Sequence, residues 1–314
     1  MTTLGWVAVP ASDLPAPDDA TAPVPVDAAL RRARAELSAA GVGSPEADAE
    51  LLLGAIARLG RGQVQAAAVR GDRLEPDAAA EYRELVRRRA GREPLQHLIG
   101  RAPFRHLVLQ VGPGVFVPRP ETETVAQLAV DALRAAAAPE PVGVDLGTGS
   151  GAIALAMATE VPHATVLGVE NSAAAYVWAR RNFDEWAPAA VLIFGDLADA
   201  LPDWRGRAAV VVSNPPYIPD DALPRDPEVL LFDPPQALYG GPDGLDVVRA
   251  VSRAAGRLLH PGGTLVLEHG DAQGAAVRDL LRRDGWLAIA THRDPAGRDR
   301  ATTALLPTAT RAPA

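Results

Sequence analysis

The chain has 314 residues, with 31 basic and 39 acidic side chains, a net charge of −8 and no cysteine. This composition excludes whole-chain disorder, a disulfide framework and thiolate metal sites, and the acidic balance argues against a protein that coats nucleic acid. No apolar run approaches the roughly 18 residues of a membrane span. The first 25 residues lack the basic-then-apolar pattern of a signal peptide, so a cytoplasmic protein is expected.

The N-terminal third of the sequence predicts a tail and a small helical domain. Residues 1–25 hold five prolines and few large apolar side chains, so we expect a disordered tail there. From Val26 onward, apolar residues recur at helical spacing, and prolines at positions typical of a first helical turn, Pro45 and Pro76, begin further helices. The pattern predicts a helical domain over residues 26–100.

The next segment changes from helical spacing to alternation. Between residues 104 and 117 apolar side chains alternate on both sides of Gly112-Pro113-Gly114. Alternation around a Gly-Pro-Gly turn is typical of a β-hairpin. We therefore expect a hairpin with its turn at these three residues, within a linker over residues 101–120.

The remainder of the chain, residues 121–314, alternates short apolar runs with helical segments. This order is typical of an α/β fold with a wound parallel sheet, and two further runs near the end predict an antiparallel pair at its edge. The expected strands are residues 142–146, 164–170, 191–194, 208–213, 263–268, 287–291 and 302–306.

A glycine-rich loop follows the first of these strands and precedes a helix. Glycines in such a loop let a ligand approach the backbone, and the helix N-terminus offers free N–H groups. Glu170 ends the second strand, where a carboxylate can bind both ribose hydroxyls, and Asp196 follows the third. The loop and the two acids resemble the S-adenosylmethionine site of Rossmann-like methyltransferases, whereas a purely structural turn would leave the acids unexplained. The loop reads Gly147-Thr148-Gly149-Ser150-Gly151.

The fourth strand ends in Asn214-Pro215-Pro216-Tyr217, at the edge of the sheet where open α/β folds place ligands. An amide or exocyclic amino nitrogen is a poor nucleophile because its lone pair is delocalised. Two acceptors, the Asn214 side-chain oxygen and the Pro215 carbonyl, could hold both of its N–H bonds and favour a pyramidal transition state. The Tyr217 ring could stack on a flat amide or base. The alternative is an Asn-Pro turn that only closes the strand.

With this loop and corner, the sequence resembles the HemK/PrmC family, whose members methylate the glutamine of the Gly-Gly-Gln motif in peptide chain release factors. Amino-methyltransferases acting on DNA share the corner at Asn214, but other segments favour this family, and the resemblance extends over residues 27–307. Those segments are Glu93 to Gly100, Val117-Pro118-Arg119-Pro120-Glu121-Thr122-Glu123, Ala237 to Leu245, Leu267 to Gly270 with Gln273, and Asp294 to Arg300.

The resemblance implies a role for each matching residue. The loop from Gly147 to Gly151 and Glu170 would bind S-adenosyl-L-methionine, with Asp196 and Leu197 beside its adenine. The corner formed by Asn214, Pro215, Pro216 and Tyr217 would hold the glutamine amide. The helical domain would help to recognise the release factor. Two departures from the family pattern, Glu170 and Asp233 where Asp and Glu are usual, bear on ligand affinity.

Three other functions remain open at this stage. A sister enzyme of the family methylates a glutamine of a large-subunit ribosomal protein, and an adenine-amino nucleic-acid methyltransferase would share the Asn214 corner. A nicotinamide enzyme or nucleoside sensor would leave that corner unused. The roles of Arg119 and Glu121, the preferred release factor and the oligomeric state do not follow from the sequence. The six histidines show no metal-ligand spacing, so no metal site is expected.

Overall fold

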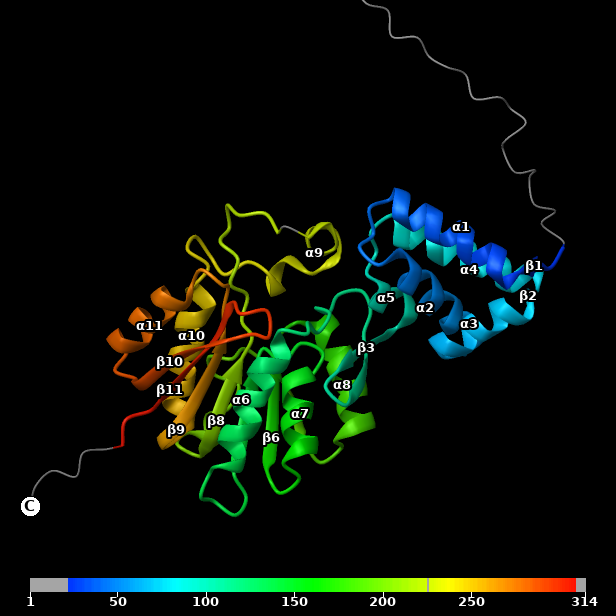
Figure 1. Ribbon diagram of the computed structural model, residues 1–314. Helices are drawn as coiled ribbons and strands as arrows, with labels where there is room; N and C mark the ends of the chain where they lie inside the picture. The colour runs from blue at the N-terminus through cyan, green and yellow to red at the C-terminus, as the bar shows by residue number, and fades with distance from the viewer. Residues whose placement is uncertain (1–21, 225, 309–314) are drawn as a thin grey trace, which may run out of the picture. The chain divides into compact units, whose positions relative to one another are not determined.

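The computed structural model describes residues 22–224 and 226–308. The chain forms two compact units, Met1–Leu95 and Gln96–Ala314. The first consists mainly of helices, drawn in blue and cyan in Figure 1, and the second is a β-sheet with helices on both faces. Within the described ranges, no helix is both long and apolar enough to cross a membrane.

The first unit buries one face of each of its long helices. Leu37, Leu52 and Tyr82, from three different helices, are almost fully buried in this core. The short strand β1 (Val24–Pro25) pairs with β2 (Arg73–Leu74), so the expected tail is wrong for its last residues. The rest of that tail, residues 1–21, lies outside the described residues. The helices described in this unit are α1 (Val26–Ala39), α2 (Pro45–Ala57), α3 (Arg61–Arg70) and α4 (Pro76–Ala90).

The hairpin after α5 (Leu95–Ile99) is present, but its predicted turn is wrong. Strands β3 (Arg101–Phe104) and β4 (Leu107–Gln110) pair with each other, and the turn falls at Arg105, whose φ is +54°. The Arg105 guanidinium fixes this turn by donating to Glu160. Gly112 has another use: a Cβ there would lie 2.4 Å from the Trp178 ring, so glycine allows close packing after the hairpin.

The second unit contains the predicted wound sheet, in the strand order β10-β11-β9-β8-β5-β6-β7. Strands β5 to β9 are parallel, and β10 and β11 add the expected antiparallel edge. The chain runs outward from β5 and then returns to β8 on its other side, so the strand order reverses between β5 and β8. Ligands bind at such a switch point. The strands are β5 (Val142–Leu146), β6 (Thr165–Glu170), β7 (Val191–Phe194), β8 (Ala208–Ser213), β9 (Leu259–Glu268), β10 (Leu287–Arg293) and β11 (Asp299–Leu305).

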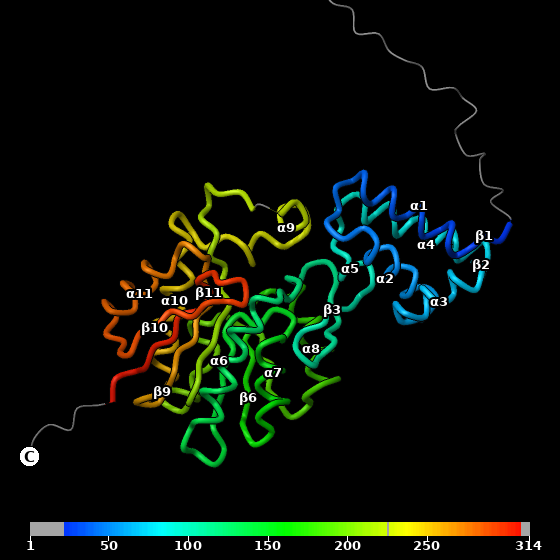
Figure 2. The backbone as a smooth tube through the Cα atoms, viewed as in Figure 1, coloured from blue at the N-terminus to red at the C-terminus, as the bar shows by residue number. Residues whose placement is uncertain are grey.

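Two hydrophobic cores, one on each face, fix the sheet between two layers of helices (Figures 1 and 2). Helices α6 (Thr122–Arg134), α7 (Ala152–Glu160) and α8 (Ala173–Trp186) pack on one face, with the β3–β4 hairpin. Helices α10 (Asp246–Leu258) and α11 (Gly274–Arg283) pack on the other. The short helix α9 (Pro227–Phe232) belongs to the long connection that follows β8.

Candidate active site

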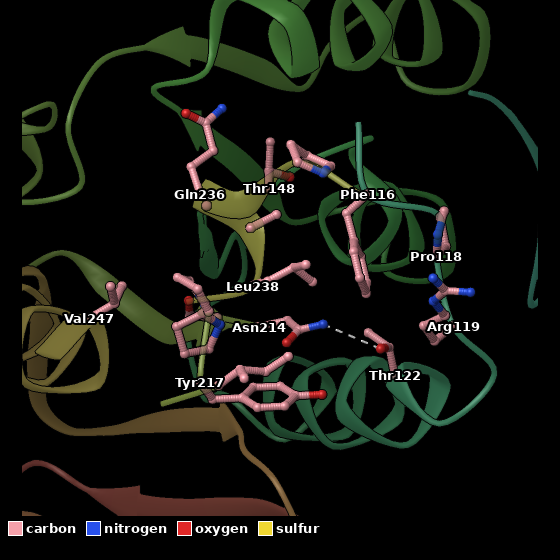
Figure 3. Close-up of a pocket in the computed structure, with 18 of the residues that line it drawn as sticks. Phe116, Pro118, Arg119, Thr122, Thr148, Asn214, Tyr217, Gln236, Leu238 and Val247 are labelled. Atoms are coloured by element: carbon pink, nitrogen blue, oxygen red, sulfur yellow. Dashed lines mark hydrogen bonds between the residues drawn. The ribbon is translucent and has the colours of Figure 1, made fainter. Parts of the chain in front are cut away.

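A cavity of about 770 Å³ opens at the carboxyl ends of β5, β6 and β8, as the strand order requires (Figure 3). Most of the residues predicted from the sequence line it, and the exceptions are Gly151 and Asp196. The predicted residues in its wall are Gly147, Thr148, Gly149, Ser150, Glu170, Leu197, Asn214, Pro215, Pro216 and Tyr217.

Asp145, at the end of β5, holds the glycine loop in place. Its Oδ2 accepts hydrogen bonds from the Thr148 hydroxyl at 2.6 Å and from the Ala154 N–H at 3.1 Å. Its Oδ1 is buried and has no hydrogen-bond partner among the described residues. Burial raises the pKa of this carboxyl to about 7. One carboxylate oxygen thus shapes the loop while the other is left for a ligand.

Gly151 has a structural part in the loop. Its φ is +91°, and a Cβ there would lie 2.8 Å from the Phe183 ring on α8. A side chain at this position would separate α7 from α8. Around Gly147 and Gly149, by contrast, an added Cβ would meet nothing within 4 Å, so the loop presents open space to the cavity at these two positions.

Glu170 is buried at the end of β6, with both carboxylate oxygens engaged by backbone. Oε2 accepts from the Gly149 N–H at 2.8 Å and Oε1 from the Ser172 N–H at 2.7 Å. Burial raises its pKa, and the backbone donors oppose that shift. A carboxylate oxygen can accept two hydrogen bonds, so Glu170 can hold the loop and still accept from a pair of hydroxyls.

The structure separates the two residues expected beside an adenine. The Asp196 side chain is exposed and accepts from the Ala198 N–H at 2.8 Å, a local turn that places it outside the cavity wall. Leu197 lines the cavity together with Gly195. Leu197 thus offers an apolar side chain to the cavity, whereas the Asp196 carboxylate is directed to its own backbone.

The Asn214 side chain has a defined orientation at the end of β8. Its Nδ2 donates to the Thr122 hydroxyl at 3.4 Å, as Figure 3 shows. Its Oδ1 takes part in no hydrogen bond within the described part of the chain. Asn214 and Pro215 both line the cavity, so a side-chain amide and a backbone carbonyl follow each other in its wall.

The corner is held from outside by a glycine turn and a glutamine. Gln273 donates from Nε2 to the Tyr217 carbonyl at 2.9 Å, and the Ile218 N–H donates to the Leu238 carbonyl at 2.9 Å. Gly244 has a φ of +70°, and a Cβ there would lie 2.3 Å from the Tyr217 oxygen. In the sequence these segments stand out only through the family resemblance, because contacts to a backbone carbonyl leave little trace in residue chemistry.

Arg119 now has a defined partner. Its Nη2 donates to Oδ2 of Asp233 at 2.7 Å, and its guanidinium carbon lies 5.0 Å from the centre of the Phe116 ring. Burial raises the pKa of Asp233, and the adjacent Arg119 opposes that shift. Arg119 and Phe116 both line the cavity, so this ion pair joins two segments of its wall.

A second buried group of polar side chains lies behind Asn214 and Tyr217. Glu268, on β9, is 1% exposed, and its Oε2 has no hydrogen-bond partner among the described residues. Burial raises the pKa of Glu268 to about 7, while a hydrogen bond with Thr122 and the charge of Arg300 oppose that shift. Thr122 and Glu268 carry no mechanistic signal of their own in the sequence, where they occur only within segments that resemble the family.

The cavity fits S-adenosyl-L-methionine in three respects. The unpaired Asp145 Oδ1 suits the cationic amino group of the ligand, Glu170 suits vicinal ribose hydroxyls, and Leu197 suits an apolar base. Carboxylates also favour a sulfonium, which carries a positive charge. In the described ranges no cluster of three or more acidic or histidine side chains could hold a metal ion.

Comparison with known proteins gives matches over most of the chain. Residues 28–100 match the PrmC N-terminal domain and residues 107–226 the methyltransferase small domain. A relative from Streptomyces coelicolor, named release factor glutamine methyltransferase, is 48% identical over 279 residues, which cover 88% of this chain and 96% of the relative. A relative from Mycolicibacterium smegmatis with the same name is 44% identical over 278 residues, covering 88% and 96%.

One similar relative has a different name. A protein from Streptomyces pristinaespiralis, named 4-amino-L-phenylalanine/4-methylamino-L-phenylalanine methyltransferase, is 39% identical over 284 residues, covering 88% of this chain and 94% of that protein.

Proposed function

The chain belongs to the release factor glutamine methyltransferase family, and from that premise we propose that it methylates the side-chain amide nitrogen (N5) of the glutamine in the Gly-Gly-Gln motif of peptide chain release factors. It is a methyltransferase that uses S-adenosyl-L-methionine. When bound, that molecule supplies an electrophilic methyl group on sulfur.

The observation that best supports this reaction is the fixed amide of Asn214. Because Nδ2 is bonded to Thr122, Oδ1 is the end of the amide that remains to accept a hydrogen bond from a ligand. Oδ1 and the Pro215 carbonyl would accept the two N–H bonds of the substrate glutamine. That grip would direct the nitrogen lone pair toward the methyl group and stabilise the positive charge that develops on nitrogen.

The other residues of the corner would hold the substrate and need not exchange protons. Burial and the nearby Glu268 raise the pKa of Tyr217, so its hydroxyl stays protonated and its ring can stack on the glutamine amide. Pro216 supplies no N–H to compete for the acceptors. The methylated nitrogen can lose its extra proton to water, so no ionised base is required.

The donor would be held by the residues that line the other side of the cavity. We assign Gly147, Thr148, Gly149 and Ser150 to its methionine part, Glu170 to its ribose and Leu197 to its adenine. Gly151 supports the loop from behind through its packing on Phe183. Asp196 lies outside the cavity wall and would contact the adenine only if its local turn opened.

The protein partner would be recognised mainly by the helical domain, residues 26–100, with 101–120 as a linker to the catalytic domain, 121–314. The charge of −8 favours a protein over a nucleic-acid substrate, and the cytoplasm, where release factors act, is the expected compartment.

The test is methyl transfer from labelled S-adenosylmethionine to a purified release factor, with three matched comparisons. The wild-type factor should be labelled, and a factor with Glu in place of the Gly-Gly-Gln glutamine should not, because a carboxylate has no N–H for either acceptor. Asn214→Ala should bind the donor normally and lower kcat at least ~100-fold. Preferential labelling of duplex DNA, of a ribosomal protein or of 4-aminophenylalanine would contradict the proposed substrate.

A further inference from the structure

Asn214 can act as described only if its amide presents Oδ1, and not Nδ2, to the substrate. The two ends of an amide have almost the same shape, so packing alone does not select one of them. A flipped Asn214 would present N–H groups to the N–H groups of the glutamine and would repel it. The orientation must therefore be set by the hydrogen-bond partner of the amide, which is Thr122.

Thr122 can select the orientation only if its own proton is directed elsewhere. A hydroxyl donates one hydrogen bond, and a free hydroxyl could either accept from Nδ2 or donate to Oδ1 of Asn214. Thr122 is 4% exposed, so bulk water does not compete for its proton. The buried carboxyl of Glu268 is a hydrogen-bond partner to which Thr122 can donate, and an ionised carboxylate only accepts.

We propose that Glu268 and Thr122 are positioning residues that fix the catalytic orientation of Asn214. Glu268, as a carboxylate, takes the Thr122 proton, the Thr122 oxygen then accepts from Asn214 Nδ2, and Oδ1 faces the cavity. Glu268 does not line the cavity; Thr122 does, and the role assigned to it here is to orient Asn214. The inference rests on the proposed transfer to a glutamine amide, and it explains why a buried carboxylate is present at the end of β9.

Burial of Glu268 makes the hydrogen-bond relay from Glu268 through Thr122 to Asn214 sensitive to protonation. With the pKa of Glu268 raised to about 7, the carboxyl gains a proton as the pH falls through that value. A protonated carboxyl can donate to Thr122, which lets the hydroxyl donate to Asn214 and favours the flipped amide. The charged and titratable groups that face Glu268 are Glu121 before α6, Arg300 on β11 and Tyr217 after β8.

The experiment compares three variants of the full chain, assayed with a release factor at saturating donor. Thr122→Val keeps the shape and removes the hydroxyl, and kcat should fall about 10- to 100-fold while donor affinity stays close to wild type and thermal stability falls no more than in the Thr302→Val control below. Thr122→Ser restores the hydroxyl and should recover most of the rate. Thr302→Val is the control, because Thr302 is equally buried on the neighbouring strand and its hydroxyl bonds to His269 instead.

The pH profile of kcat separates positioning from general support of the fold. Wild-type kcat should decline below pH ~7, and Glu268→Gln, whose side chain does not titrate, should lose that decline. Wild-type rates in Thr122→Val, an equal loss in Thr302→Val, or an unchanged acid limb in Glu268→Gln would overturn the relay. If wild-type enzyme failed to label the release factor at all, the proposed function would fail instead, and the two failures are therefore distinct.

Discussion

Glu170 shows how one side chain can serve both the fold and the ligand. Its two oxygens hold the backbone of Gly149 and of Ser172, and the residue also lines the cavity. The carboxylate is longer than the aspartate that is usual in the family, yet the loop reaches it with hydrogen bonds of ordinary length. Having Glu at position 170, where the family usually has Asp, therefore shifts the position of the carboxylate but keeps its charge.

Replacing Glu170 by Ala should weaken binding of S-adenosylhomocysteine by about 2–3 kcal/mol, because buried polar partners are left unpaired. Glu170→Gln keeps the volume and should lose less. Since burial raises the pKa of Glu170, its ionised form is lost as the pH falls, so wild-type affinity should decrease toward acid pH. Titration calorimetry measures each value, and equal affinities for Ala and wild type would refute the assignment.

At the scale of whole elements, the Asn214 corner depends on the turn that packs against it. Gly244 places its backbone against the Tyr217 carbonyl, and a side chain there must displace one of the two. Gly244→Ala should lower kcat at least ~10-fold and destabilise the protein, through both the close contact and the positive φ.

The matched control for Gly244→Ala is the same substitution at Gly256, where an added methyl group has free space. Gly256 lies within α10, where an added Cβ would meet nothing within 4 Å, so Gly256→Ala should leave kcat unchanged and stabilise the helix slightly. Steady-state kinetics and thermal unfolding measure both variants. Equal effects of the two substitutions would show that the Tyr217 contact is unimportant.

Asn182 links three elements at the back of the glycine loop. Its Oδ1 accepts from the Gln110 N–H at 2.7 Å, and its Nδ2 donates to the carbonyls of Gln110 and Ser150, each at 2.9 Å. Asn182→Ala should cost about 2–4 kcal/mol of unfolding free energy, since buried backbone groups lose their partners. It should also weaken donor binding by loosening Ser150.

Asn182→Asp is the informative second variant. It keeps the acceptor for Gln110 but places a carboxylate against two carbonyl oxygens, so it should be at least as destabilising as Ala at neutral pH. Protonation restores a donor, so part of the loss should be recovered in acid. Denaturant unfolding at two pH values measures this, and a neutral effect of both variants would contradict the linking role.

Over the whole molecule, the sequence predicted the features that depend on local patterns and missed those that depend on contacts between distant residues. The parallel strands follow from apolar runs such as Val191–Phe194, and the site follows from the Asn214 corner, because both patterns are local. The hairpin turn was predicted at the wrong place because Gly112 serves close packing against the ring of Trp178, which is distant in the sequence. The turn itself falls at Arg105, which adopts a positive φ without being glycine. Asp196 does not line the cavity, contrary to the prediction, because its side chain accepts a hydrogen bond from the nearby Ala198 backbone.

The two units predict a division of labour that truncation can test. Among the residues that the structure describes, those that line the cavity all lie between Gly114 and Arg300, inside the second unit. A chain lacking residues 1–91 should therefore bind S-adenosylhomocysteine as tightly as the full chain, while KM for the release factor rises about 10-fold or more because partner contacts are lost. Circular dichroism establishes that the shortened chain is folded. Collapse of donor affinity in a folded chain, or an unchanged KM, would show that the helical domain serves the cavity and not the partner.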